Sequence, residues 1–157
     1  MEKHSVDNRK PQDRYLLGVP ILTNFNMKGL GTIHVSPKGV RINTSLDICS
    51  YYQWHIRKAF YNTVKTQLPK YKAHITIANP NIHKNCDFNT VKGLNGKKVT
   101  FEYNPQEIFR SRKNFWIPVK FDLEKEIKNL LKIVDSPNYL GLHLTICNMK
   151  FENGHVT

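Results

Sequence analysis

A short strand pattern occurs twice in this chain, each time after a predicted amphipathic helix and a proline-containing break. The first copy, residues 71–78 (YKAHITIA), alternates between side-chain types with a period of two, and so does the second, residues 140–146 (LGLHLTI). This alternation is typical of a half-buried β-strand. Because both copies share the same preceding elements, we expect one α+β domain made of two related lobes.

The rest of the pattern predicts further strands and two helices. Short β-rich runs bounded by Pro, Gly and Ser predict strands, and the two around Ser36-Pro37-Lys38 predict a hairpin. The strands are expected at 15–23, 31–35, 39–44, 98–103 and, as one or two more, within 106–121.

Apolar residues at helical spacing predict a helix within 47–67, which Pro69 ends. A second helix is expected to begin at the N-cap residue Asp122 and to carry an apolar stripe as far as Val134. The segment between the first repeat and the next strands, residues 79–97, is rich in Asn, Lys and Gly and predicts a long loop with at most a short helical turn.

Length and composition predict a single basic domain. The chain has 157 residues, and no Gly- or Ser-rich linker divides it, so we expect a loose tail at 1–12 and one domain over 13–157. Its 24 Lys and Arg residues against 12 Asp and Glu give a formal charge of +12. Such a charge attracts anionic ligands such as nucleotides and RNA, although a solvated basic surface explains it equally well.

The location is expected to be the cytoplasm. No run of about 18 apolar residues is present, so we expect no membrane span, and the polar first residues lack the apolar run of a secretory signal. Cys49, Cys86 and Cys147 are an odd number of cysteines without metal spacing, which predicts free thiols in a reducing compartment. Cys147 is interpreted as a packing residue.

Each repeat places one imidazole and one hydroxyl on the same face of its strand. Side chains two apart on a strand point the same way, so His74 shares a face with Thr76, and His143 shares a face with Thr145. If the two lobes pack side by side, these four groups meet across a cleft. The positions expected to point into the core are Ala73, Ile75, Ile77, Leu142, Leu144 and Ile146.

Two such histidines suit the cleavage of a phosphodiester. A neutral imidazole can accept a proton from a hydroxyl or a water, while a protonated one donates to the leaving oxygen. The hydroxyls of Thr76 and Thr145 can donate to the phosphate oxygens as charge develops there. This chemistry needs no metal or cofactor. Two alternatives stay open: ordinary half-buried histidines, and a zinc site, which the lack of a third ligand at metal spacing disfavours.

At these residues the sequence resembles the 2H phosphoesterase superfamily, whose signature is a pair of His-x-Thr/Ser motifs on the central strands of two lobes. The copies here are HITI and HLTI, separated by 143 − 74 = 69 residues, and the segment FWIPVKFDLEKEIKNLLKIV resembles the strand and helix before the second motif. The resemblance implies a two-lobed pseudo-symmetric fold, with antiparallel sheets around a central cleft and helices outside. It implies that His74 and His143 are catalytic, and that Thr76 and Thr145 hold the phosphate.

The resemblance also implies a class of substrate. Family members cleave 2′,3′-cyclic phosphates at RNA ends, 2′–5′ linkages, or cyclic oligonucleotide signals. The small size of the chain favours the compact phage members that destroy the messengers of bacterial CBASS defence, which would act in the host cytoplasm. The alternatives are an RNA end-processing 2′,3′-cyclic phosphodiesterase, and a basic RNA- or nucleotide-binding module that does not turn over its ligand. The oligomeric state is open.

A nucleotide substrate also needs a stacking surface and further positive charge. The aromatic candidates are Tyr15, Trp116 and Tyr139, the last just before the second motif. Arg110 and Arg112, in the basic turn RSRKN, are candidates for contact with a second phosphate. The alternative interpretation needs no ligand: each aromatic residue packs in the core, and the arginines belong to a solvated turn.

Overall fold

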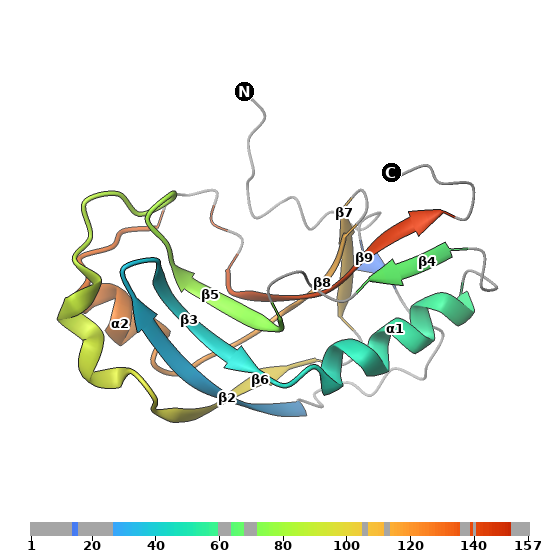
Figure 1. Ribbon diagram of the computed structural model, residues 1–157, viewed down its shortest axis with the longest axis horizontal. Coiled ribbons are helices and arrows are strands. Elements are labelled where there is room, and N and C mark those ends of the chain that lie inside the picture. The colour runs from blue at the N-terminus through green and yellow to red at the C-terminus, as the bar shows by residue number, and fades with distance from the viewer. Residues whose placement is uncertain are drawn as a thin grey trace.

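One curled antiparallel sheet forms the body of the computed structural model, with α1 and α2 at opposite ends of it (Figure 1). The structure describes residues 14–15, 27–59, 64–67, 72–104, 107–111, 114–135, 139 and 141–151. The elements are β1 (Arg14–Tyr15), β2 (Met27–Ser36), β3 (Gly39–Thr44), α1 (Asp47–Ala59), β4 (Val64–Gln67), β5 (His74–Ala78), the 3-10 helix η3 (Phe88–Leu94), β6 (Lys98–Tyr103), β7 (Ile108–Ser111), β8 (Asn114–Pro118), α2 (Glu124–Leu130) and β9 (His143–Phe151).

The two strands that carry the repeated motifs are neighbours in the middle of the sheet. The strand order is β1-β7-β8-β9-β5-β3-β2-β6, and β4 adds to β9 beside this path. All the described strand pairs are antiparallel. The expected α+β class with antiparallel strands is therefore confirmed.

A row of aliphatic side chains crosses the centre of the sheet and forms the core of the fold. Its members are direct partners on the successive strands β2, β3, β5, β9 and β8, namely Ile33, Ile42, Ile75, Leu144 and Ile117. All of them are fully buried, at 0 % exposure. Burying one such side chain stabilises the fold by about 1.5–3 kcal/mol. The six motif positions expected to point inward are likewise buried.

The first helix is shorter than the sequence predicted, because part of the expected helix is a strand. The helix ends at Ala59, and Val64–Gln67 forms β4, which pairs with residues 148–151 of β9. The Thr66 hydroxyl donates to Gln53 Oε1 at 2.8 Å and accepts from Arg57 Nε at 2.7 Å. These side-chain bonds attach β4 to α1, and the local apolar spacing gave no sign of them. Residues 60–63 lie outside the described residues.

The second helix was also predicted too long. It spans Glu124–Leu130, its N-cap residue is Leu123 rather than Asp122, and no side chain caps it. Ile127 and Leu131 are buried at 0 % and 5 % exposure, whereas Val134 is 93 % exposed. The expected apolar stripe therefore ends at Leu131, where the backbone leaves the helix.

Most other expected elements are present with small changes of boundary. The hairpin is formed by β2 and β3, the segment 106–121 contains β7 and β8, and the loop 79–97 contains the helical turn η3. The predicted strand 15–23 lies outside the described residues beyond Tyr15, as does the expected tail 1–12.

The three cysteines are free thiols, as expected. Cys49 and Cys147 are both fully buried. Burial raises the pKa of the Cys49 thiol to about 11 and that of Cys147 to about 12. Because the thiolate is the reactive form, both residues are suited to packing.

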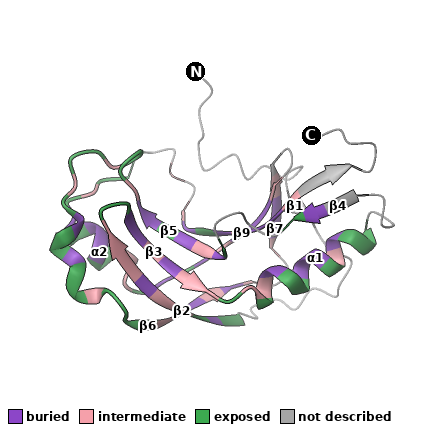
Figure 2. Cartoon of the chain, in the orientation of Figure 1, coloured by how far each residue is buried: buried purple, intermediate pink, exposed green. Residues whose placement is uncertain are grey.

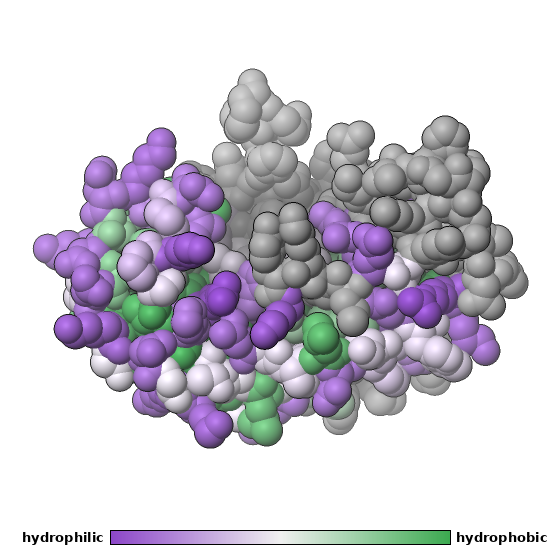
Figure 3. All heavy atoms as spheres, viewed as in Figure 1, coloured by the Kyte–Doolittle hydropathy of each residue, from purple (hydrophilic) through white to green (hydrophobic). Residues whose placement is uncertain are grey.

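The described surface is largely polar. In the space-filling view hydrophilic side chains dominate, and apolar ones form small separate patches (Figure 3). Within the described part of the chain, no helix is long and apolar enough to cross a lipid bilayer.

Candidate functional site

The two His-x-Thr motifs lie next to each other across the middle of the sheet. β5 and β9 pair antiparallel with Ile75 opposite Leu144. The pairing consists of this one residue pair, and an antiparallel register continued from it places His74 opposite Thr145 and Thr76 opposite His143. In a regular antiparallel pair, directly opposed residues have Cβ atoms about 4.5–5.5 Å apart, and diagonal neighbours, the relation of the two histidines in this register, are about 7–8 Å apart or slightly less. A phosphate group fits between two imidazoles at that spacing.

These four side chains share the face of the sheet that points away from the aliphatic row. Buried and more exposed residues alternate along β3 and β5 (Figure 2). His74 and Thr145 are half-buried, whereas Thr76 and His143 are exposed. The structure therefore brings together the four residues that the sequence selected, and leaves them accessible to a ligand.

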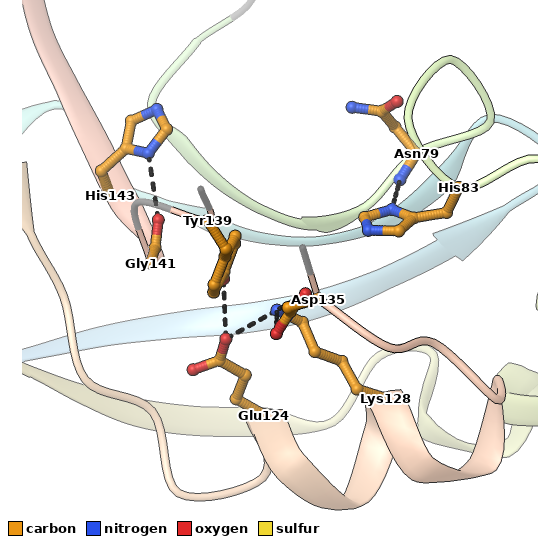
Figure 4. A network of polar contacts seen from close by, with 8 residues as sticks. All are labelled: Asn79, His83, Glu124, Lys128, Asp135, Tyr139, Gly141 and His143. Atoms are coloured by element: carbon orange, nitrogen blue, oxygen red, sulfur yellow. Dashed lines mark hydrogen bonds and ion pairs between the residues drawn. The ribbon is translucent and has the colours of Figure 1, made fainter. Parts of the chain in front are cut away.

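Both imidazoles are oriented in the same way by the backbone. His74 Nδ1 lies 3.2 Å from the carbonyl oxygen of Lys72, and His143 Nδ1 lies 3.4 Å from that of Gly141 (Figure 4). A carbonyl oxygen can only accept, so Nδ1 carries the hydrogen in both rings. Each Nε2 is then a proton acceptor in the neutral ring and a proton donor in the charged one.

An unusual backbone conformation positions each of these carbonyls. Lys72 has φ of 69° and Gly141 has φ of 90°, and each lies two residues before its histidine. Positive φ is common for glycine and costs a residue with a Cβ about 1–2 kcal/mol. A strained lysine at the same offset as a glycine indicates that the turn before the histidine is required in both copies.

Substitution at these two turns is expected to have unequal effects on the free energy of unfolding. Gly141→Ala places a Cβ at positive φ and should lower the free energy of unfolding by about 1–2 kcal/mol. Lys72→Gly, the matched change, removes such a Cβ and should leave the stability unchanged or slightly higher. Urea denaturation of both variants measures the difference. A Gly141→Ala variant as stable as the parent would show that the turn tolerates a side chain.

Trp116 is placed beside the second motif. On β8 it is the direct partner of Thr145 of β9, and the centre of its ring lies 5.3 Å from that of the His143 ring. The indole is stacked on Phe109 at 4.9 Å and is only 9 % exposed. The structure therefore places Trp116 as a wall of the site, with one face of its ring covered by Phe109.

Tyr139 is close to the second motif but belongs to a polar network with α2. Its hydroxyl donates to Glu124 Oε2 at 2.7 Å, and Lys128 Nζ lies 3.8 Å from the centre of its ring (Figure 4). The buried Lys128 also forms ion pairs with Glu124 at 2.8 Å and with Asp135 at 3.1 Å. These contacts hold Tyr139 near the turn at Gly141.

Of the other predicted binding residues, only Arg110 has a described side chain, and it is not brought to the motifs. Arg110 pairs with Phe115 across the β7–β8 hairpin, and its guanidinium lies 5.8 Å from that ring. Because neighbours along β8 alternate, Arg110 lies on the opposite face from Trp116. Arg112 lies outside the described residues. Tyr15 pairs with Ile108 at the β1 edge, and its side chain is outside the description.

Sequence reasoning missed Arg41 and its neighbours on β2 and β3. Arg41 is the direct partner of Thr76 on one side and of His34 on the other, and Asn43 is the partner of His74. Arg41, His34, His74 and Thr76 all line a cavity of about 830 Å³. The alternation in GVRINT places Arg41 on the polar face of its strand. Only the strand order shows that this face continues into the first motif.

Among the described residues, no group of three or more His, Cys, Asp or Glu side chains is arranged to hold a metal ion. In the comparisons with known proteins, no family model matches this chain, and no curated protein or solved structure is significantly similar to it.

Proposed function

We propose that this chain is a phosphodiesterase that uses His74 and His143 as its acid–base pair on a nucleotide phosphate, without a metal ion. One observation carries the proposal. The two imidazoles lie on paired central strands, and each donates its Nδ1 hydrogen to the carbonyl two residues earlier. This leaves both Nε2 atoms able to exchange protons.

We further propose that the two halves of the sheet are pseudo-symmetric lobes of a 2H-type fold. In one half the hairpin β2–β3 is followed by α1 and by β5, which pairs with β3. In the other half the hairpin β7–β8 is followed by α2 and by β9, which pairs with β8. The matching turns at Lys72 and Gly141 also support this proposal.

The proposed reaction divides the proton transfers between the two histidines. One neutral imidazole takes the proton of a ribose hydroxyl beside the scissile phosphate, and the hydroxyl oxygen forms a new bond to phosphorus. The protonated second imidazole gives its proton to the leaving oxygen as the P–O bond breaks, which yields a cyclic phosphate and a free hydroxyl. With a cyclic phosphate as substrate, water takes the place of the hydroxyl. Thr76 and Thr145 donate to the non-bridging oxygens, where negative charge increases.

Within this class we propose a cyclic or 2′–5′/3′–5′ linked oligonucleotide as the substrate, of the kind that signals host defence. A phage protein acting on such a signal would work in the host cytoplasm. The close spacing of the chain's two motifs supports this choice.

A panel of substrates in EDTA tests the proposal. It contains cyclic di- and trinucleotides, 2′–5′ oligoadenylate, and RNA ending in a 2′,3′-cyclic phosphate, with products separated by chromatography. We expect the wild type to cleave at least one cyclic or 2′–5′ linked member, and the variant His74→Ala/His143→Ala to cleave none. Cleavage of RNA ends alone would make the chain an RNA-processing enzyme. No product from any member would contradict the proposal and favour a binding module.

A further inference from the structure

We propose that Arg41, together with His34 and Lys38, binds a second phosphate of the substrate beside the scissile one. This inference rests on the proposed function and defines its substrate more closely. It implies a ligand with at least two phosphates, so a nucleoside with a single cyclic phosphate would leave the subsite empty.

The strand order places Arg41 next to the scissile position. Moving outward from the first motif, Thr76 on β5 is followed by its partner Arg41 on β3 and then by His34 on β2. Adjacent strands are about 4.8 Å apart, so the backbone of Arg41 lies roughly 5 Å from Thr76, and that of His34 roughly 10 Å. A phosphate one nucleotide away from the bond that is cleaved falls within reach of a long arginine side chain on this side.

Among the described residues, the Arg41 side chain has no ion-pair partner. Its Nε atom is shielded from solvent and has no hydrogen-bond acceptor. Both ion pairs found among the described residues involve Lys128 instead. A buried donor without an acceptor is costly, and a planar guanidinium matches the oxygens of a phosphate. A bound phosphate would therefore supply the missing acceptor.

The cavity beside Arg41 has the size and charge for this ligand. Its volume of about 830 Å³ lies within the range of 300–1,000 Å³ that is common for small-ligand sites. Lys38, at the tip of the β2–β3 hairpin, adds a second cation to its wall. None of the described lining residues is acidic. An anion in this cavity would meet positive charge and no carboxylate.

On the other side of the two motifs, the two register partners described on β8 carry no charge. On β8 the partner of Thr145 is Trp116, and the partner of His143 is Pro118. At the corresponding register positions the site is therefore cationic toward β3 and apolar toward β8. This asymmetry gives the substrate one direction, with its second phosphate toward β2 and β3.

Binding of three linear diadenylates tests the subsite independently of turnover. ApA has one phosphate, whereas pApA and ApAp each carry an additional terminal one. Affinities are measured by titration calorimetry at fixed salt, in a His143→Ala background that prevents cleavage. We expect one of the two terminal phosphates to raise the affinity by about 10- to 100-fold, the range of a charge-assisted contact. Arg41→Gln should remove most of this gain, and Arg41→Lys should keep part of it.

The control is Lys92→Gln, which removes one positive charge from an exposed residue of η3 and should keep the full gain in affinity from the terminal phosphate. An equal gain in the parent and in Arg41→Gln would overturn the subsite, as would the lack of any gain from either phosphate. If Arg41→Gln fails to fold in thermal unfolding, His34→Gln decides, because it removes a neighbour of the same phosphate and leaves Arg41 in place. Failure of the proposed function is separate, because it appears as a wild type without product in the substrate panel.

Discussion

Replacing either motif histidine by alanine is expected to reduce kcat/KM by about 10²–10⁴-fold, the usual contribution of a positioned acid or base. The losses in kcat/KM from the two single variants should not be additive in the double variant. Because His74 and His143 act in one proton-transfer step, the double variant should be little worse than the poorer single variant. Steady-state kinetics on whichever substrate the wild type cleaves measures all three variants. The matched control is His55→Ala on α1, which removes an imidazole that contacts the rings of Tyr51 and Trp54 and belongs to neither motif, and this variant should keep full activity.

The pH profile identifies which histidine has which role. The wild type should give a bell-shaped profile, since activity requires one neutral and one protonated imidazole. In the variant that lacks the base, the residual activity should no longer fall toward low pH. In the variant that lacks the acid, it should no longer fall toward high pH. A flat wild-type profile from pH 5 to pH 9 would rule out the two-histidine scheme.

Local pattern was sufficient to predict most of the described strands, β4 excepted, and which motif residues point into the core. Alternation with a period of two depends only on neighbours in the chain, so it identified Ile75 and Leu144 as core positions and His74 and His143 as their outward neighbours. The β2–β3 hairpin was equally local, because its turn residues lie between the two strands that they join.

Long-range pairing could not be predicted in this way. The segment Val64–Gln67 continues the apolar spacing of α1, yet it pairs with β9, which lies more than 80 residues further along the chain (148 − 67 = 81). The polar face of β3 was recognisable, but its position next to the first motif depends on the strand order. Arg41 was therefore missed, while Arg110 was selected although it lies on the opposite face from Trp116.

The same register links the stability of the fold to the geometry of the site. Ile75 and Leu144 are the residue pair through which β5 and β9 meet, and each lies between the histidine and the threonine of its motif. Packing of these two side chains on the buried face therefore sets how closely the four polar groups approach on the other face.

Truncation at this junction is expected to cause the largest loss of stability in the chain. Ile75 and Leu144 are both fully buried, so Ile75→Ala and Leu144→Ala should each lower the free energy of unfolding by about 2–5 kcal/mol. The control is Leu30→Ala on β2, the same chemical change at a side chain that is 74 % exposed, which should cost less than about 0.5 kcal/mol. Urea denaturation gives all three values, and a Leu144→Ala variant as stable as Leu30→Ala would refute the proposed role of the junction. Because the two residues are direct partners, the double variant should lose less than the sum of the single losses, since the second truncation enlarges a cavity that already exists.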